Sequence, residues 1–349
     1  MERSRRRNDC ARRGNVRAGV GSGCSLVKTF GNKRALLIVS LAVLSFASIL
    51  TGNAEFHLAD LFSPGSERFK LLMISRLPRL LAVVVTGGGI CVAGMIMQTI
   101  ARNRFVSPSI TGTVAWCKLG ILVGTLWFAQ AAMMSRMALA FAFAAGGTLL
   151  FMRILGQLRY RGVATVPLVG IILGSVVESG NTYLATRYDL VQNMESWLQG
   201  SFSLIVRGRY ELLYLGIPVA LLIYAYANKF TIAGLGRDFA VGLGLNHGQI
   251  VALGLLLVSL MTSVVTITVG SIPFVDLIIP NLVSLYRGDN LRANLPDTAL
   301  LGANFVLLCD LLSRMVMRPY EVPVGVTASI VGGGVFLYLL VRRNRLASA

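Results

Sequence analysis

Apolar runs long enough to cross a lipid bilayer recur along almost the whole chain, and this pattern limits the fold more than any other feature. A membrane-spanning helix needs about 20 mainly apolar residues. Hydrophobic residues make up 55% of the 349 residues and charged residues only 14%, against about 25% charged in an average soluble domain. The sequence therefore predicts one all-α integral membrane domain over residues 35–345. We place ten spans at 35–52, 77–98, 108–128, 132–152, 164–186, 211–227, 248–270, 274–286, 297–317 and 325–341.

Residues 1–34 differ in composition from the rest of the chain. They hold ten Lys and Arg side chains against Glu2 and Asp9, with many Gly and Ser and no apolar period. We interpret this segment as a disordered, basic cytoplasmic tail, in keeping with the excess of cations on the cytoplasmic side of membrane proteins. Nucleic-acid binding and a misplaced start codon are weaker alternatives. A cleavable signal peptide is not expected, because the next apolar run leads directly into a multi-span chain.

The cations between the spans predict the orientation of the chain. With the tail inside, the cytoplasmic loops and the C-terminus carry most of the basic side chains. These are Arg102, Arg104, Arg153, Arg159, Arg161, Lys229, Arg237, Arg287, Arg292, Arg342, Arg343 and Arg345. Both termini are therefore expected in the cytoplasm. Arg76 and Arg79 lie on the outer side against this trend, and Arg314 lies near an outer helix end, so these three cations need a partner.

Motifs for nucleotide hydrolysis and covalent catalysis are missing from the sequence. The glycine-rich stretch "GVGSGCS" lacks the Lys-Ser/Thr ending and the preceding strand of a phosphate-binding loop. No H-E-x-x-H or G-x-S-x-G motif is present, and neither the five cysteines nor His57 and His247 have the spacing of a metal site. We therefore expect a transport pathway rather than an enzyme, with no metal and no cofactor bound by this chain.

Several segments in order resemble one transport family. "RLPRLLAVVVTGGGICVAGMIMQTIARNRFVSPSITG" begins at Arg76, "MESWLQGS" occupies 194–201 and "GLGRDFAVGLGLN" occupies 234–246. They are followed by "GSIPFVDLIIPNLVSLYRGDNLRANLPDTALLGA" (270–303) and "CDLLSRMVMRPYEVPVGVTASIVGGGVFLYLLVRR" (309–343). From about residue 35 onward, the chain resembles the FecCD-type permeases of ABC importers for iron chelates and vitamin B12. The resemblance implies a type II ABC importer permease fold of about ten transmembrane helices in a bacterial inner membrane.

A few positions depart from the pattern of that family. Asn281 and Ser284 stand where the family commonly has His and Arg, and Asp276 stands where it usually has Gly. Arg104 follows Asn103 where Pro usually does. Asn281 together with the stretch "YRGDNLR" is similar to the branch that imports ferric catecholate siderophores, which narrows the expected substrate.

The resemblance implies partners outside this chain. Family members work as a pair of permeases, identical or paralogous, on two ATPase subunits that hold ATP and Mg, and a substrate-binding protein delivers the substrate. We accordingly expect a ferric siderophore as substrate, membrane lipid around the helices and no nucleic acid. A cobalamin or haem permease of the same fold is one alternative. A stand-alone secondary transporter or channel is another, although it would need a coupling-ion site and the sequence offers no cluster of intramembrane acids.

By motif position, the outer arginines would be the docking points for the binding protein. They are Arg76 and Arg79 of "RLPR" and Arg314 of "LLSR". Carboxylates on the partner would explain cations on this side, since complementary charges set the orientation and rate of encounter. The alternative is snorkelling or an internal ion pair. It is strongest for Arg314, because Asp310 lies four residues earlier on the same helix face.

The cytoplasmic loop 228–247 is the candidate for coupling to the ATPase. A helix of one or two turns would present the apolar side chains of Phe239, Ala240, Leu243 and Leu245 there, and an ordinary interfacial turn is the alternative. The positions that we assign to this role are Gly236, Arg237, Gly242, Gly244 and Leu245.

The connection 101–108 resembles the inner gate of the family. Asn103 and Phe105 would narrow the cytoplasmic mouth of the pore, with Val163 and Ala164 facing them from the start of the fifth span. A buried packing role for Phe105 is the alternative.

Lys118 and Glu178 are charged residues deep inside predicted spans. Lys118 lies about ten residues into the third span and Glu178 about fourteen into the fifth, roughly 15 Å and 21 Å from the cytoplasmic end at 1.5 Å per residue. A charge at that depth costs several kcal/mol unless it has water or a partner. Two hypotheses stay open: the two residues form a structural ion pair, or Lys118 faces the pathway and attracts an anionic ferric catecholate.

Overall fold

The structure is a computed structural model that describes residues 21–51, 72–128, 133–158, 165–203, 205, 211–288, 290–317 and 320–347. All regular elements in these ranges are helices, so the expected all-α fold is confirmed. The long helices are α2 (Gly21–Leu50), α4 (Leu77–Ala101), α5 (Thr113–Trp127), α6 (Met133–Gln157), α7 (Thr165–Arg187), α9 (Gly216–Leu235), α11 (His247–Thr268), α13 (Leu291–Val316) and α14 (Val324–Ala347). The shorter ones are the π-helix η2 (Leu72–Arg76), α8 (Val191–Leu198), the 3₁₀ helix η3 (Glu211–Leu215), α10 (Arg237–Gly242) and α12 (Val275–Arg287).

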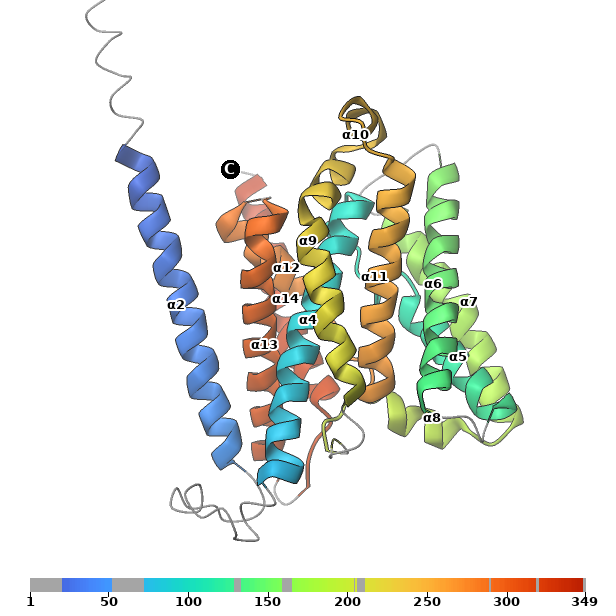
Figure 1. Ribbon diagram of the computed structural model, residues 1–349. Coiled ribbons are helices and arrows are strands. Elements are labelled where there is room, and N and C mark those ends of the chain that lie inside the picture. Colours follow the sequence, from blue (N-terminus) through green and yellow to red (C-terminus); the bar gives the residue numbers. More distant parts are fainter. Residues whose placement is uncertain are drawn as a thin grey trace, which may run out of the picture.

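The long helices stand side by side as a bundle. Figure 1 shows α10 and the C-terminus at one end of the bundle and α8 at the other. We call these the α10 end and the α8 end. Six of the described helices are long and apolar enough to cross a membrane, and three shorter apolar helices accompany them. Each of the ten expected spans overlaps at least one helix. The span 211–227 covers η3 and the start of α9, and the 13-residue α12 lies at the position of the short eighth span.

Several helices begin or end at residues other than those expected. The causes are capping residues, a glycine turn and a lysine that lies within a helix. Helix α9 continues to Leu235, past Lys229, whose ammonium lies 4.6 Å from the ring centre of Tyr226. Helix α13 begins early because the side chain of Asn290 accepts a hydrogen bond from the backbone of Ala293 and caps the first turn. Helix α5 begins late, because Gly112 has a φ of +80° and holds the preceding residues in a turn.

The first helix begins earlier than the sequence predicts. Helix α2 runs over Gly21–Leu50, so residues 21–34, which we expected to be disordered, are helical. Nucleating a helix is costly, but lengthening an existing helix gains one hydrogen bond for each residue that becomes ordered. The helix formed by the apolar run can therefore extend into the polar residues before it. Residues 1–20 of the expected tail lie outside the described residues.

Helix α4 forms the centre of the bundle. In the segment Leu72–Ala101, 83% of the most apolar stretch is buried, against 22% in α7. Helix α4 packs against α9, α11, α12 and α13. A Cβ atom on Gly87 would lie 2.6 Å from the carbonyl oxygen of Gly302 in α13. The small residues of α4 therefore allow close helix contact, as the sequence predicts.

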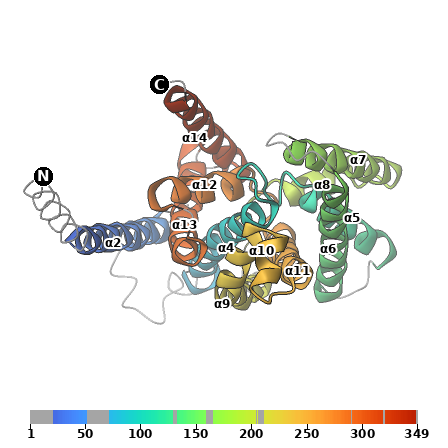
Figure 2. The same ribbon diagram turned by 90° about the horizontal axis from the view of Figure 1, so that it is seen from above.

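Helix α2 lies at the edge of the bundle, beside α13 (Figure 2). Polar side chains join the two helices. The Nε atom of Arg34 donates to Asp297 at 2.6 Å, and the hydroxyl of Ser40 donates to the side chain of Asn304 at 2.9 Å. The other face of α2 exposes apolar side chains such as Val43. We call the row of contacts between α2 and α13 the polar seam.

Candidate functional site

The α8 end holds four charged side chains that contact one another, which we call the rim cluster: Arg79, Asp310, Arg314 and Glu321. The guanidinium of Arg79, near the start of α4, donates to Asp310 at 2.8 Å and to Glu321 at 2.9 Å. Arg314 follows Asp310 by one turn of α13 and pairs with the second oxygen of that carboxylate. Asp310 is fully buried. Both guanidiniums are therefore neutralised within the chain.

Two of the outer arginines also bind the end of α2. The guanidinium of Arg314 donates to the hydroxyl of Ser48 at 2.6 Å and to the carbonyl of Thr51 at 2.9 Å. Arg76 donates to the carbonyl of Ile49 at 2.5 Å. The last carbonyls of a helix lack partners inside the helix and favour cations, so these arginines cap α2.

These contacts bear on the expected docking residues. Arg314 is only 8% exposed, and its pair with Asp310, the alternative that the sequence offered, is present. Arg79 is 13% exposed at its side chain, and Arg76 is half-buried. Docking of a binding protein stays a prediction for all three. For Arg79 and Arg314 it requires a partner that shares or displaces contacts already made inside the chain.

Glu321 joins the rim cluster to a second segment of the α8 end. It lies between α13 and α14, and its carboxylate accepts a hydrogen bond from the hydroxyl of Ser203 at 2.8 Å. Burial disfavours its charged form, but Arg79 and Ser203 outweigh burial and lower the pKa of Glu321 below its ordinary value. The sequence gives no signal for this residue, because Arg79 lies 242 positions away.

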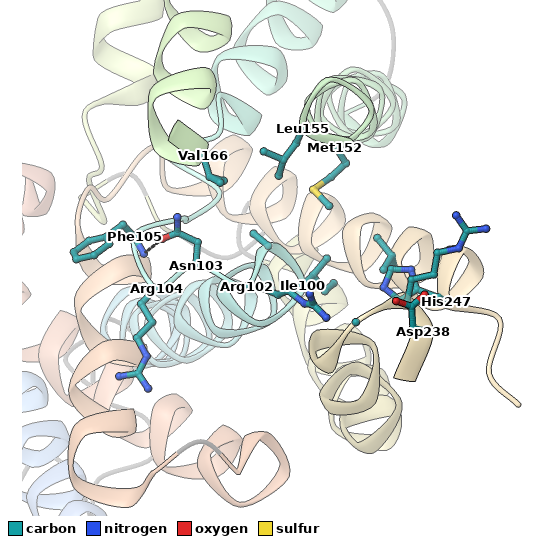
Figure 3. Close-up of a pocket in the computed structure, with 14 residues that line it drawn as sticks. Ile100, Arg102, Asn103, Arg104, Phe105, Met152, Leu155, Val166, Asp238 and His247 are labelled. Atoms are coloured by element: carbon teal, nitrogen blue, oxygen red, sulfur yellow. Dashed lines mark hydrogen bonds between the residues drawn. The ribbon is translucent and has the colours of Figure 1, made fainter. Parts of the chain in front are cut away.

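The α10 end contains a cavity of about 670 Å³ between the ends of α4, α6, α10 and α11 and the start of α7. Its lining includes the expected gate residues Asn103 and Phe105 and the expected coupling residues Gly236 and Arg237. Figure 3 shows Asn103 and Phe105 near Val166 of α7, with Asp238 and His247 together on the other side. The structure thus brings the gate and coupling segments to one cavity. Two other expected gate residues, Val163 and Ala164, lie outside the described residues.

Asn103 and Phe105 have different roles in the gate segment, which we define as 103–109. The side chain of Asn103 is almost fully buried and accepts a hydrogen bond from the backbone of Phe105 at 2.9 Å, which shapes the turn after α4. The ring of Phe105 packs edge-on against Phe336 of α14, with 6.4 Å between the ring centres. The amide of Asn281 in α12 donates to the carbonyl of Arg104 at 2.8 Å. The gate segment is therefore held by α12 and α14, and Phe105 has the packing contact that the sequence left open.

The expected coupling loop contains a short helix, α10, between two glycines with positive φ. These are Gly236 at +126° and Gly244 at +76°, angles that other residues rarely adopt. The side chains of Phe239, Val241 and Leu243 are each 58% exposed. The expected short helix is present and Phe239 and Leu243 are exposed, but Ala240 is buried and Leu245 is half-buried. Contact with an ATPase stays a prediction.

Two other expected coupling residues have simple surroundings. Gly242 ends α10 and has open space around its Cα. The backbone N–H of Leu245 donates to the carbonyl of Ala240 at 2.9 Å, which closes the turn after α10. Neither residue shows a contact that would by itself assign it to coupling.

Lys118 and Glu178 form the ion pair that their depths allow. The Nζ atom of Lys118 lies 2.5 Å from a carboxylate oxygen of Glu178, across the contact of α5 with α7. Asn181 donates to the other oxygen at 3.3 Å. The hypothesis of an ion pair is confirmed. The side chain of Glu178 is 44% exposed while that of Lys118 is 12% exposed, so the pair opens to one side.

A stripe of hydroxyl side chains accompanies the exposed face of α7, and we did not predict it. The residues recur every three or four positions, which places them on one helix face. They are Ser175, Ser179, Thr182 and Thr186, and all four are exposed. Several donate to carbonyls one turn earlier, as Thr182 does to Glu178 at 3.0 Å. Their spacing in the sequence is the signal that would have revealed the stripe.

Known proteins resemble this chain over nearly its whole length. The sequence matches the FecCD transport family over residues 40–342. It is 48% identical over 315 residues to the petrobactin import system permease protein YclN of Bacillus subtilis, which covers 90% of this chain and 100% of that protein. It is 41% identical over 308 residues to the ferric-anguibactin transport system permease protein FatD of Vibrio anguillarum, covering 88% and 98%. The fold is similar to that of a metal-chelate type ABC transporter in an inward-facing conformation, with a TM-score of 0.75 at 22% identity, covering 88% of this chain and 97% of that one.

Proposed function

Because the chain belongs to the FecCD transport family, we propose that it is the permease subunit of an ABC importer for a ferric siderophore of the catecholate class. Membership makes the chain a membrane transport subunit and not an enzyme. The observation that carries the substrate is the pair of full-length relatives above 40% identity, which are named for petrobactin and ferric anguibactin. The form with Asn281 and the stretch "YRGDNLR" supports the catecholate class independently.

The partners follow from the same family and from the two ends of the bundle. ATPase subunits with ATP and Mg would bind the α10 end, since α10 exposes Phe239 and Val241 there and Leu243 follows directly after the helix. A substrate-binding protein would dock at the α8 end through Arg76 and Arg79. A second permease, identical or paralogous, would complete the pathway. This arrangement places the α10 end and both termini in the cytoplasm, as the distribution of cations favours.

The ion pair on α5 and α7 is our candidate for contact with the substrate inside the membrane. Glu178 is too exposed for a carboxylate in hydrocarbon, because a charge at that depth costs several kcal/mol without water or a partner. An aqueous pathway beside the hydroxyl stripe of α7 satisfies this requirement. An anionic ferric chelate passing along that stripe would meet the pair of Lys118 and Glu178, in which Lys118 supplies a cation.

Uptake of labelled iron tests the proposed function. A strain that lacks this gene is given ferric chelates with catecholate, hydroxamate and citrate donors, and labelled cobalamin in a parallel culture. We expect the deletion to abolish uptake of a catecholate-containing chelate and a plasmid copy to restore it. Loss of cobalamin uptake alone would assign the chain to the alternative substrate. Uptake without any ATPase subunit would contradict the ABC importer assignment.

A further inference from the structure

Three aspartates are almost completely buried in the described part of the chain, and only two of them have cationic partners. Asp310 pairs with Arg79 and Arg314, as described for the rim cluster. Asp297 pairs with Arg34 and Arg287. These contacts neutralise both carboxylates.

Asp276 is the exception among these three. Its exposure is 0%, and it has no ion pair among the described residues. One carboxylate oxygen, Oδ2, accepts hydrogen bonds from the backbone of Ser109 at 3.1 Å and from its hydroxyl at 2.7 Å. The other oxygen, Oδ1, is buried without a hydrogen-bond partner.

A full negative charge on Asp276 would not be compensated at this place. The residue lies in the first turn of α12, where the helix dipole supplies the equivalent of roughly half a positive charge. Two hydrogen bonds from Ser109 add partial compensation, and the hydroxyl of Ser107 and the backbone N–H of Asp276 itself add weaker contributions. Removing a carboxylate from water requires an opposite charge with good geometry and partners for both oxygens. One oxygen of Asp276 has no hydrogen-bond partner. A buried carboxylate at this place therefore needs a bound cation to neutralise its charge.

The surroundings of Asp276 favour a proton over a metal ion as the source of this positive charge. Gly94 of α4 packs directly on the backbone of Asp276, so closely that a Cβ atom at Gly94 would overlap the carbonyl of Asp276. No group of three His, Cys, Asp or Glu side chains that would hold a metal ion is found in the described residues. A metal ion such as Mg²⁺ or Ca²⁺ requires about six oxygen ligands. We propose that Asp276 is a proton-binding site and is present as the neutral carboxylic acid in the folded permease.

The hydrogen-bond partners of Asp276 can stay in place when its carboxylate is protonated, because only hydroxyl hydrogens need to rotate. Hydroxyl hydrogens rotate to suit their partners, so a proton on Oδ2 can be donated to the hydroxyl oxygen of Ser109 across the same 2.7 Å. Ser109 then donates to the hydroxyl of Ser107, which lies 2.9 Å away. Oδ1 becomes the carbonyl oxygen of a neutral acid, and its lack of a partner is less costly than for an anion.

Few other titratable groups act on this site. Helix α12 packs against α4, α13 and α14. Cys91 of α4 is the titratable side chain that interacts with Asp276. No charged side chain of the described residues contributes to the electrostatics of Asp276. The protonation of Asp276 therefore depends on its burial and its hydrogen bonds and not on the charge of a neighbouring side chain.

The proton has a consequence for the gate segment. Ser109 lies at the end of that segment, and Asn281 holds its beginning from the same helix. Both contacts join the gate segment to α12: the contact with Asp276 involves a fully buried side chain, whereas the contact with Asn281 is exposed. Ionisation would place an uncompensated charge under the gate segment and draw in water. We therefore expect the proton on Asp276 to strengthen the attachment of the gate segment to α12 at Ser109.

Infrared spectroscopy of the full chain in lipid nanodiscs tests the proposal directly. A protonated carboxyl group has a C=O stretch that an ionised carboxylate lacks. We expect this band at neutral pH in the wild type and its loss in Asp276→Asn, whose amide has the shape of the neutral acid. Glu178→Gln is the matched control, because it removes an intramembrane carboxylate that is paired with a lysine and should leave the band unchanged.

Thermal unfolding over a pH series provides the second measurement. If the folded protein holds the proton more tightly than the unfolded chain does, the stabilisation is greatest in acid and declines as the pH rises, by up to about tenfold in the folding equilibrium constant per pH unit. Asp276→Asn does not titrate, so the Tm of the wild type should fall relative to that of Asp276→Asn as the pH rises from about 5 to about 8.

Three outcomes would overturn the proposal. One is a wild-type spectrum without a band that Asp276→Asn removes. Another is a Tm difference that does not change with pH. The third is a Tm that depends on sodium in the wild type and not in Asp276→Asn, since this would assign the positive charge to a metal cation. None of these measurements uses a transported substrate, so they do not depend on the function proposed above.

Discussion

The two ends of the helix bundle differ in how far their functional candidates are buried. At the α8 end, the rim cluster buries Asp310 completely and leaves its two arginines 13% and 8% exposed. At the α10 end, Arg237 is exposed beside an open cavity, and Phe239 projects from α10. The rim cluster satisfies its charges inside the chain, while α10 presents side chains that are mostly exposed in the described part of the chain. Residues of the rim cluster should therefore act mainly on stability, and residues of α10 on association.

The largest effect is expected at the centre of the rim cluster. Asp310→Ala leaves the guanidiniums of Arg79 and Arg314 buried without their shared carboxylate. Breaking a buried ion pair by removing one partner costs about 3 to 5 kcal/mol. We expect a large loss of folded protein, measured by gel filtration after solubilisation and by thermal unfolding. Glu195→Ala removes an exposed carboxylate of α8 and is the control. Equal stability of the two variants would refute the contrast between the ends.

The second expected effect concerns the apolar surface of α10. Phe239→Ser combined with Leu243→Ser removes two exposed apolar side chains, and central interface side chains contribute more than about 1 kcal/mol each to binding. We expect the ATPase subunit to be lost on co-purification, while Tm changes little because neither side chain is buried. Phe239→Leu keeps an apolar surface and should retain the ATPase. Retention by the double variant, together with normal uptake, would remove α10 as the coupling element.

The third effect tests a case between the two extremes. Lys118 and Glu178 are paired, but the carboxylate is half exposed. Lys118→Met should therefore cost less than Asp310→Ala, about 1 to 2 kcal/mol, between the values for exposed and buried pairs. Adding Glu178→Gln should restore Tm by removing the unpaired charge. If Lys118 instead serves the substrate, the single variant is stable and uptake of anionic chelates falls more than uptake of neutral ones.

The smallest effect is expected from the outermost member of the rim cluster. Arg79 and Ser203 lower the pKa of Glu321, so the folded protein favours the carboxylate. Its stabilisation is complete above the ordinary pKa, which is 4.5 for this group, and is lost as the pH falls through the lower folded value. Glu321→Gln should therefore reduce Tm slightly at neutral pH, and the difference should vanish in strong acid. A difference that grows in acid would contradict this sign.

Hydropathy predicted where the chain crosses the membrane because each span repeats the same requirement for an apolar surface. It misplaced helix ends where the cause is local: the side chain of Asn290 starts α13 early, and the turn at Gly112 delays α5. The pair of Lys118 with Glu178 was predictable since helical rise converts position into depth. The helix starts depend on residues next to them in the sequence, and the depths of Lys118 and Glu178 depend on their positions within their own spans.

The rim cluster and the site of Asp276 could be predicted only in part. The spacing of Asp310 and Arg314 gives one ion pair, but Arg79 meets Glu321 from 242 residues away. Likewise, the departure from glycine at Asp276 marks an unusual position without indicating that Ser109 would be its partner. These contacts depend on which helices pack together, and helices with uniformly apolar surfaces do not encode their neighbours by periodicity.

The polar seam has a consequence for the order in which the protein assembles. Helix α2 is among the first segments made, yet Arg34 and Ser40 find their partners on α13, 263 and 264 residues later. At about 5 to 20 residues per second, a ribosome needs roughly 15 to 50 s to synthesise that length of chain. During this interval the hydroxyl of Ser40 has no access to Asn304. The polar seam therefore forms late, and in a nascent chain that stops before α13 the contacts of α2 with η2 and α4, among them Arg76 with the carbonyl of Ile49, form without the seam.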